Sequence, residues 1–189
     1  MLLKRTGRLL GIALASLLVT ASHAEAKDLA GVKMPDTLSV GGKSLVLNGL
    51  GLRKKAIFKV YVGGLYLESA SKDAPGIVAA DTAKAIRMQF LRSIGKDKLI
   101  EGFKEGFEGN AGDKLVTQKA NMDKFLALTA DVKDGDVWTF SYAPGKGTVI
   151  SHGEKEVGMF EGKEFADALF SIWLGPKPPS DDLKKGMLG

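Results

Sequence analysis

The chain has 189 residues, a formal net charge of +5 at pH 7 and no cysteine. The absence of cysteine excludes disulfides and thiol nucleophiles, and the mild basic excess is too dispersed among acidic residues to predict a nucleic-acid partner. The chain has two histidines, His23 and His152. They are too few for a histidine metal cluster, and they leave no second histidine to support a Ser-His-Asp triad. We therefore predict neither a metal site nor a cofactor.

Residues 1–26 have the pattern of a secretory signal peptide. A basic start, an apolar run and an Ala-Glu-Ala cleavage motif follow one another at residues 4–8, 9–20 and 24–26. The apolar run is shorter than the roughly 20 residues that a membrane span needs. We predict cleavage before Lys27 and export to the periplasm or the medium, with no membrane span in the processed chain. An uncleaved membrane anchor is the alternative.

After the signal peptide the chain is long enough for one domain with a core of its own. We place this domain at residues 27–178, because no linker, repeat or low-complexity segment divides it. Residues 179–189 are polar, and we expect them to form a tail that contributes nothing to the core.

The domain begins with an extended segment, residues 28–35. Two short strands, 38–40 and 44–48, flank Gly41-Gly42, which is typical of a hairpin turn. The next two glycines, Gly49 and Gly51, predict a second turn.

The second turn leads to Arg53 and then to a long strand at residues 56–67. This strand is rich in β-branched and aromatic residues, which suit a half-buried sheet. Gly63-Gly64 interrupts it, which indicates a bulge or a close approach of another backbone segment.

The middle of the chain changes from strand to helical periodicity. Asp73 and Pro75 favour the start of a helix, which we expect to be short at most and to cover residues 76–81. Residues 83–91 alternate as in a strand with one solvated face. Residues 95–110 place Leu99, Phe103 and Phe107 on one side of an amphipathic helix. Its two internal glycines indicate close packing of this helix against the sheet.

The last part of the domain again combines helices and strands. A helix is predicted at residues 121–130, a meander of three strands at 137–142, 148–152 and 155–160, and a final helix at 163–174. Gly175-Pro176 ends that helix. Together the elements predict an α+β fold, in which helices cover one face of an antiparallel sheet.

Three segments of this chain resemble the chalcone isomerase-like family. Residues 49–53 are similar to its Gly-x-Gly-x-Arg turn, residues 59–68 to the strand that follows, and residues 173–175 to the end of its closing helix. The resemblance covers roughly residues 38–178. It implies an open-faced β-sandwich, in which a helical layer covers a long antiparallel sheet and a ligand cleft lies between them.

Catalysis in the plant members of this family depends on polar residues that are only partly present here. The resemblance implies that those enzymes cyclise a chalcone to a flavanone with the arginine of this turn, a strand threonine, and a tyrosine and an asparagine near the first long helix. Arg53 matches, but Tyr61 stands where the threonine would fall, and residues 93–103 contain neither tyrosine nor asparagine. We therefore predict little chalcone cyclisation and assign no catalytic residue.

Non-catalytic relatives of the same fold bind fatty acids, with an arginine and a tyrosine on the carboxylate. The resemblance thus implies Arg53 and Tyr61 as ligand contacts, and a guanidinium gives a carboxylate a strong bidentate contact. Arg92 is a secondary candidate for the ligand head, and Phe103 and Phe107 are secondary candidates for its tail. An amphiphile-binding carrier or sensor is our first hypothesis. An isomerase or intramolecular lyase for an enone-like substrate, and a protein-interaction module without a small ligand, are the alternatives.

Overall fold

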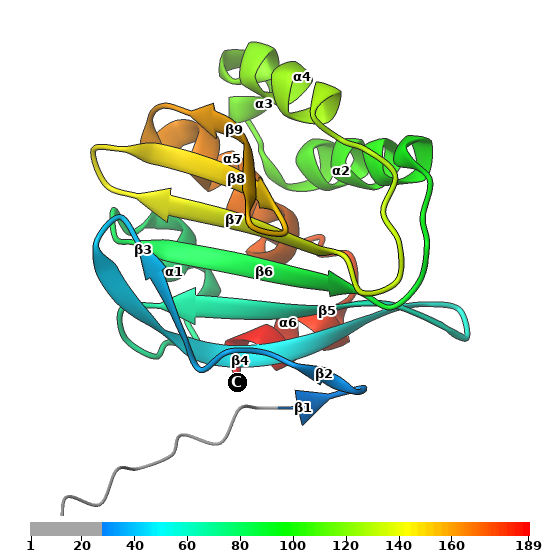
Figure 1. Ribbon diagram of the computed structural model, residues 1–189. Coiled ribbons are helices and arrows are strands. Elements are labelled where there is room, and N and C mark those ends of the chain that lie inside the picture. Colours follow the sequence, from blue (N-terminus) through cyan, green and yellow to red (C-terminus); the bar gives the residue numbers. More distant parts are fainter. Residues whose placement is uncertain (1–27) are drawn as a thin grey trace, which may run out of the picture.

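The computed structural model describes residues 28–189, as Figure 1 shows. The predicted signal peptide and its cleavage site lie outside the described residues.

A seven-stranded antiparallel sheet forms the body of the protein. Each strand pairs with the next one in the sequence, in the order β3-β4-β5-β6-β7-β8-β9. The strands are β3 (Thr37–Val40), β4 (Lys43–Lys55), β5 (Phe58–Leu67), β6 (Lys84–Phe90), β7 (Val137–Ala143), β8 (Gly147–His152) and β9 (Lys155–Phe160). A separate small hairpin, β1 (Asp28–Leu29) and β2 (Val32–Lys33), precedes them. The meander predicted for the last three strands is confirmed.

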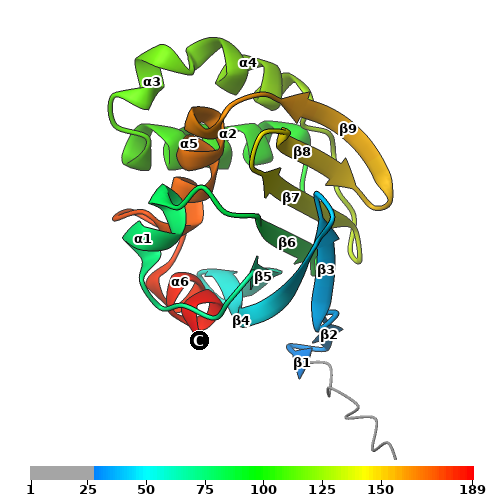
Figure 2. The same cartoon turned by 90° about the vertical axis from the view of Figure 1, so that its left-hand side faces the viewer.

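The helices lie on one side of the curled sheet, which the view in Figure 2 shows from its edge. They are α1 (Ala74–Ala79), α2 (Lys96–Asn110), α3 (Lys114–Thr117), α4 (Lys119–Ala127), α5 (Lys163–Leu174) and α6 (Asp181–Leu188). Helix α5 is buried along most of its length between the sheet and the outer helices. The predicted α+β fold with a one-sided helical layer is therefore confirmed, while the short helix α3 was not predicted.

The C-terminal segment is a helix and part of the core, so the predicted polar tail is wrong. In α6 the side chains of Leu183 and Met187 are fully buried against β4 and β5. The Ser180 hydroxyl accepts a hydrogen bond from the Leu183 backbone N–H at 3.2 Å, which caps the helix. The hydrophobic residues of this segment are few, but they recur at helical spacing and all reach the core.

The turn predicted at Gly49 and Gly51 is also wrong, because both residues lie inside β4. A methyl group on Gly51 would overlap the carbonyl oxygen of Leu183, so α6 packs directly on the strand backbone. The actual turn is Ala56-Ile57, in which Ala56 adopts a left-handed φ of 53°. The two glycines thus make room for a helix that follows them by more than a hundred residues.

Other glycines show the same kind of close packing. Gly63 pairs in regular register with Gly51, and a methyl group on it would lie 3.3 Å from the Leu183 side chain, so the close approach is confirmed and the bulge is absent there. Gly106 of α2 packs against Ile172 of α5 and not against the sheet as predicted, whereas Gly102 faces open space.

Candidate functional site

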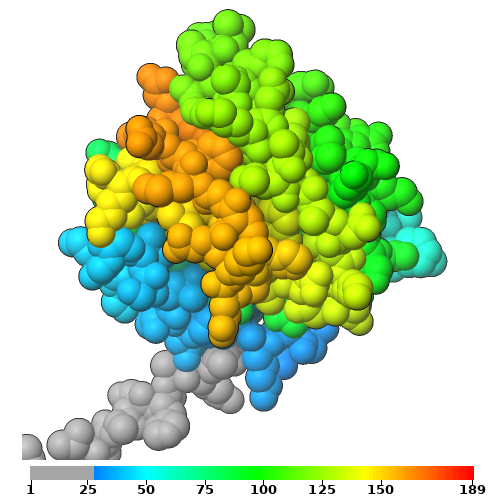
Figure 3. Space-filling view, turned by 45° about the horizontal axis from the view of Figure 1, so that its top comes forward, coloured from blue at the N-terminus to red at the C-terminus, as the bar shows by residue number. Residues whose placement is uncertain are grey.

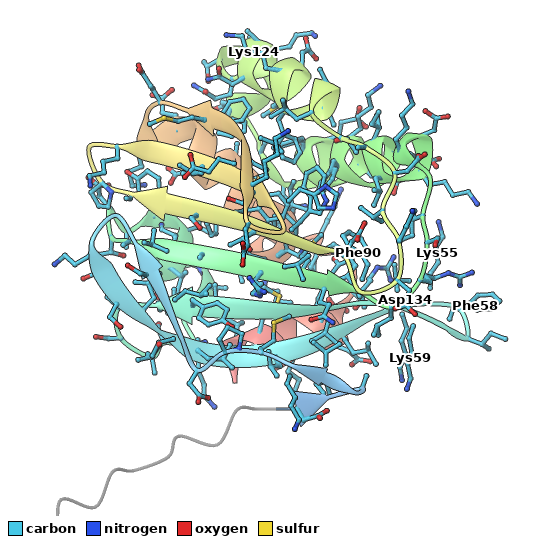
Figure 4. All side chains as sticks on the ribbon, viewed as in Figure 1. Lys55, Phe58, Lys59, Phe90, Lys124 and Asp134 are labelled. Carbon is cyan, nitrogen blue, oxygen red and sulfur yellow. The ribbon has the colours of Figure 1, made fainter. Side chains whose placement is uncertain are left out.

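A cleft of about 790 Å³ opens at one end of the sheet, between the β4–β5 hairpin and helix α2. Its volume lies within the roughly 300–1,000 Å³ of small-molecule sites. The inner wall is apolar and comes from β5, β6, α2 and α5: Val60, Met88, Phe90, Phe103, Ile172 and Trp173. Figure 4 labels Phe90 at this end of the sheet, near Lys55 and Phe58 of the hairpin. The cleft can therefore take an apolar group into its interior.

Arg53 and Tyr61 lie side by side on the wall of this cleft, with Arg53 half-buried and Tyr61 buried. They face each other in the register of β4 and β5, and both line the cleft. Arg53 is half-buried, and among the described residues its guanidinium makes no ion pair and one hydrogen bond, to the carbonyl oxygen of the neighbouring Lys54. Most of its donors are consequently available to a ligand.

The Tyr61 hydroxyl is set up to donate a hydrogen bond. It is 8% exposed, and it accepts a hydrogen bond from Trp173 Nε1 at 3.1 Å. Burial raises the pKa of Tyr61 to about 12, against the opposing effects of the Trp173 hydrogen bond and the Arg53 charge. The hydroxyl is thus neutral near pH 7 and keeps its proton. No side chain or carbonyl of the described residues accepts this proton, which leaves it for a ligand oxygen.

Arg92 follows strand β6 and lies on the same side of the cleft mouth. Its guanidinium carbon is 4.5 Å from the centre of the Phe58 ring, a cation–π contact that joins it to the hairpin. Arg53, Lys55 and Arg92 therefore make this side of the mouth basic.

The opposite wall, helix α2, is largely acidic at its rim. It contributes Asp97, Glu101 and Glu105 to the cleft lining, with Lys98 as the basic exception. This distribution of charge would attract an anionic group to the hairpin side of the cleft and repel it from the helix side.

Four of the five ligand contacts predicted from the sequence line this one cleft: Arg53, Tyr61, Arg92 and Phe103. Phe107 does not, because it is buried under α4, where its ring meets Phe125 edge-to-face at 5.8 Å. The helical spacing of Phe107 correctly predicted that it faces the core side of α2. It could not predict that α4 covers the turn of α2 that carries Phe107. Whether the four residues bind a ligand stays a prediction.

Most residues of the apolar wall were not predicted from the sequence as part of a ligand site. The alternation predicted for residues 83–91 puts Met88 and Phe90 on one strand face, and Trp173 was predicted only as an apolar residue of the final helix and as part of a family motif. The alternation in β6 was enough to predict that Met88 and Phe90 point to the same side of the sheet. It could not predict that this part of the strand lies at the end of the sheet where the cleft opens. In the described part of the chain, no His, Asp and Glu side chains gather into a metal-binding group of three or more.

The comparisons with known proteins agree with this architecture. A family profile described as chalcone isomerase-like matches residues 26–189. The crystal structure of a fatty-acid binding protein from Arabidopsis thaliana is similar, with a TM-score of 0.67 and 16% sequence identity, over 84% of this chain and 92% of that one. No curated protein sequence matches the chain. At this identity the structural likeness concerns the fold alone.

Proposed function

The chain belongs to the chalcone isomerase-like family. From that premise we propose that it is a non-catalytic carrier or sensor, which binds a fatty acid or similar amphiphile in the cleft with Arg53 on the carboxylate. The observation that carries the proposal is the pair of unused donors, Arg53 and Tyr61, on the wall of an apolar cleft. The fatty-acid binding protein with the same fold is consistent with this ligand class.

The site can supply both parts of the binding energy that an amphiphile needs. A hydrogen-bonded charge pair with Arg53 is worth about 1.5–3 kcal/mol. Along the apolar wall, each CH₂ group removed from water adds about 0.8 kcal/mol. The hydroxyl of Tyr61 gives the head group a second, neutral donor whose position is fixed by Trp173.

The buried, neutral Tyr61 hydroxyl is poorly suited to the acid–base role that the isomerase alternative gives it. A general acid or base works best when its pKa is near the working pH, and burial raises the pKa of Tyr61 to about 12. We expect chalcone cyclisation to stay at the spontaneous rate in an absorbance assay. Turnover like that of a plant enzyme, abolished in Arg53→Ala, would establish an isomerase instead.

Calorimetric titration with one long-chain fatty acid tests the binding proposal. Arg53→Ala is expected to weaken binding by about 10–150-fold, which corresponds to roughly 1.5–3 kcal/mol. Arg53→Lys is expected to restore only part of the affinity, because an ammonium lacks the planar pair of donors. The methyl ester of the acid is expected to bind weakly and with little dependence on Arg53.

Arg87→Ala is the matched control, since it removes a guanidinium from the same sheet outside the cleft. It is expected to leave the affinity of the folded protein unchanged. Equal affinities of the wild type, Arg53→Ala and Arg53→Lys, all folded, would overturn the assignment of Arg53.

Export is part of the proposal and is supported by the sequence motifs of residues 1–26. None of the described helices is long and apolar enough to cross a membrane. Edman sequencing of protein from its native host is expected to start at Lys27. An intact residue 1 on the purified protein would contradict cleavage.

A further inference from the structure

The tip of the β4–β5 hairpin, residues 54–59, projects from the body of the protein next to the cleft. In Figure 3 it is the cyan segment at the right-hand edge, beside the green of α2. Its apolar side chains are unusually accessible: Ile57 is 87% exposed and Phe58 is 53% exposed. Large apolar side chains that stay mostly in water gain little from the fold, so they are candidates for contact with a partner.

The charges of the hairpin tip are all positive. Lys54, Lys55 and Lys59 are exposed, and among the described residues no carboxylate forms an ion pair with them. Lys54 lies directly opposite Lys59 in the strand register. Like charges in such a cross-strand pair are destabilising, and an anionic surface would remove this repulsion.

We propose that the hairpin tip docks the protein on an anionic lipid bilayer. Exposed Ile57 and Phe58 would enter the boundary between head groups and acyl chains, and the lysines around them would meet the anionic head groups. A two-residue turn is too small for a specific protein interface, which buries roughly 800 Å² on each partner. A bilayer needs no such area, because its surface is continuous and adapts to the tip.

Docking in this way places the mouth of the cleft at the membrane. Lys55 and Phe58 line the cleft as well as the tip, and the Phe58 ring contacts Arg92. The head group of an amphiphile that leaves the bilayer along the tip would contact Arg53 first. This transfer route rests on the proposed function, whereas the docking itself does not.

Cosedimentation with vesicles of pure phosphatidylglycerol tests the proposal, with vesicles of pure phosphatidylcholine for comparison. The wild type is expected to bind the anionic vesicles and not the zwitterionic ones. The double variant Lys54→Gln/Lys59→Gln is expected to bind about 30-fold more weakly, at about 1 kcal/mol for each lysine near the surface. Ile57→Asp is expected to abolish binding, because it places a negative charge at the extremity.

Matched controls are available on the helical side of the protein. Lys119→Gln/Lys124→Gln removes the same charge from exposed positions of helix α4, and Figure 4 shows Lys124 at the far end of the molecule from the tip. Val116→Asp places a negative charge on another strongly exposed apolar residue, 82% exposed on α3. Both controls are expected to bind anionic vesicles nearly as well as the wild type.

A fluorescent variant reports insertion directly. Both native tryptophans, Trp138 and Trp173, are buried, so Ile57→Trp adds the one exposed indole of the described chain. Its emission is expected to shift to shorter wavelengths with phosphatidylglycerol vesicles. No vesicle binding by the wild type, equal losses in tip and control variants, or an unshifted emission would each overturn docking.

The same variants separate docking from ligand binding. Lys54, Ile57 and Lys59 do not line the cleft, so their variants are expected to titrate with a fatty acid as the wild type does. Vesicle binding without fatty-acid binding would support docking and overturn the proposed function. The opposite result would overturn docking alone.

Discussion

Two basic residues of the same sheet, Lys84 and Arg53, have opposite surroundings. Lys84 is 1% exposed on β6, and its ammonium donates hydrogen bonds to the carbonyl oxygens of Ile77, Val78 and Ala80 at 2.7, 3.1 and 2.7 Å. These carbonyls belong to the last turn of α1 and its C-cap, where the helix dipole favours a cation. Arg53 is half-buried at a cleft mouth and bonds to one carbonyl of its own strand.

The difference separates a cation whose donors are used by the fold from one whose donors are available to a ligand. All three donors of Lys84 are used within the fold, so it has none left for a ligand. Arg53 has several donors that no described residue uses. A buried cation is kept by the bonds that compensate its desolvation, whereas a cation with unused donors beside an apolar cleft is available for recognition.

Replacing Lys84 should give the largest effect on stability. Lys84→Met leaves three backbone carbonyls without a donor, and we expect the free energy of unfolding to fall by about 2–4 kcal/mol. Urea denaturation measures it, with the exposed Lys124→Met as the control. An unchanged midpoint for Lys84→Met would mean that the three hydrogen bonds contribute nothing net.

The pH dependence of stability sharpens the same contrast. Burial lowers the pKa of Lys84 to about 8; Lys163 lowers it further, and Asp167 and Asp81 oppose the shift. Between pH 8 and the unfolded value of 10.5 the folded state binds fewer protons, so raising the pH favours folding.

We expect the free energy of unfolding of the wild type to rise by about 1 kcal/mol per pH unit between roughly pH 8 and 10, relative to Lys84→Met. Above roughly pH 10.5 this difference levels off, because Lys84 is then neutral in both the folded and the unfolded state. The free energy of unfolding of both proteins then falls, because burial raises the pKa of Tyr61 and of Tyr142 to about 12 and folding opposes their ionisation. Parallel pH profiles of the two proteins would show that Lys84 keeps its ordinary pKa.

Tyr61→Phe should have a smaller effect on binding than Arg53→Ala. It removes one neutral donor to the ligand and the acceptor of the Trp173 Nε1 hydrogen bond, and it leaves the ring in place against Phe90. We expect fatty-acid affinity to fall by about 0.5–1.5 kcal/mol, roughly 2–13-fold, in a calorimetric titration. A loss as large as that of Arg53→Ala would show that the hydroxyl, and not the guanidinium, dominates recognition.

Arg53→Ala should have the smallest effect on stability. Its guanidinium makes no ion pair with a described residue, so the free energy of unfolding is expected to change by less than about 0.5 kcal/mol. Thermal unfolding without ligand measures this. A loss comparable to that of Lys84→Met would erase the distinction and make Arg53 a structural residue.

The sequence predicted the candidate site better than its surroundings. Arg53 and Tyr61 were chosen together from a family motif, and the strand register places them opposite each other. Lys84 was overlooked, because the alternation of β6 says only that its side chain faces the helices. A lysine can be buried there because the backbone carbonyls at the end of α1 accept its hydrogen bonds. No sequence pattern around Lys84 predicts that these carbonyls lie next to it.

The sequence by itself determined most of the strands and helices, because the alternation of side chains in a strand and the helical repeat are local properties of the chain. Tertiary structure alone decided the roles of Gly51 and of residues 181–188. The sequence around Gly51 was interpreted as a turn, and residues 181–188 were interpreted as part of a polar tail. In the structure the backbone of Gly51 packs against the backbone of α6. Such a contact joins residues far apart in the sequence, so neither pattern shows it before the chain has folded.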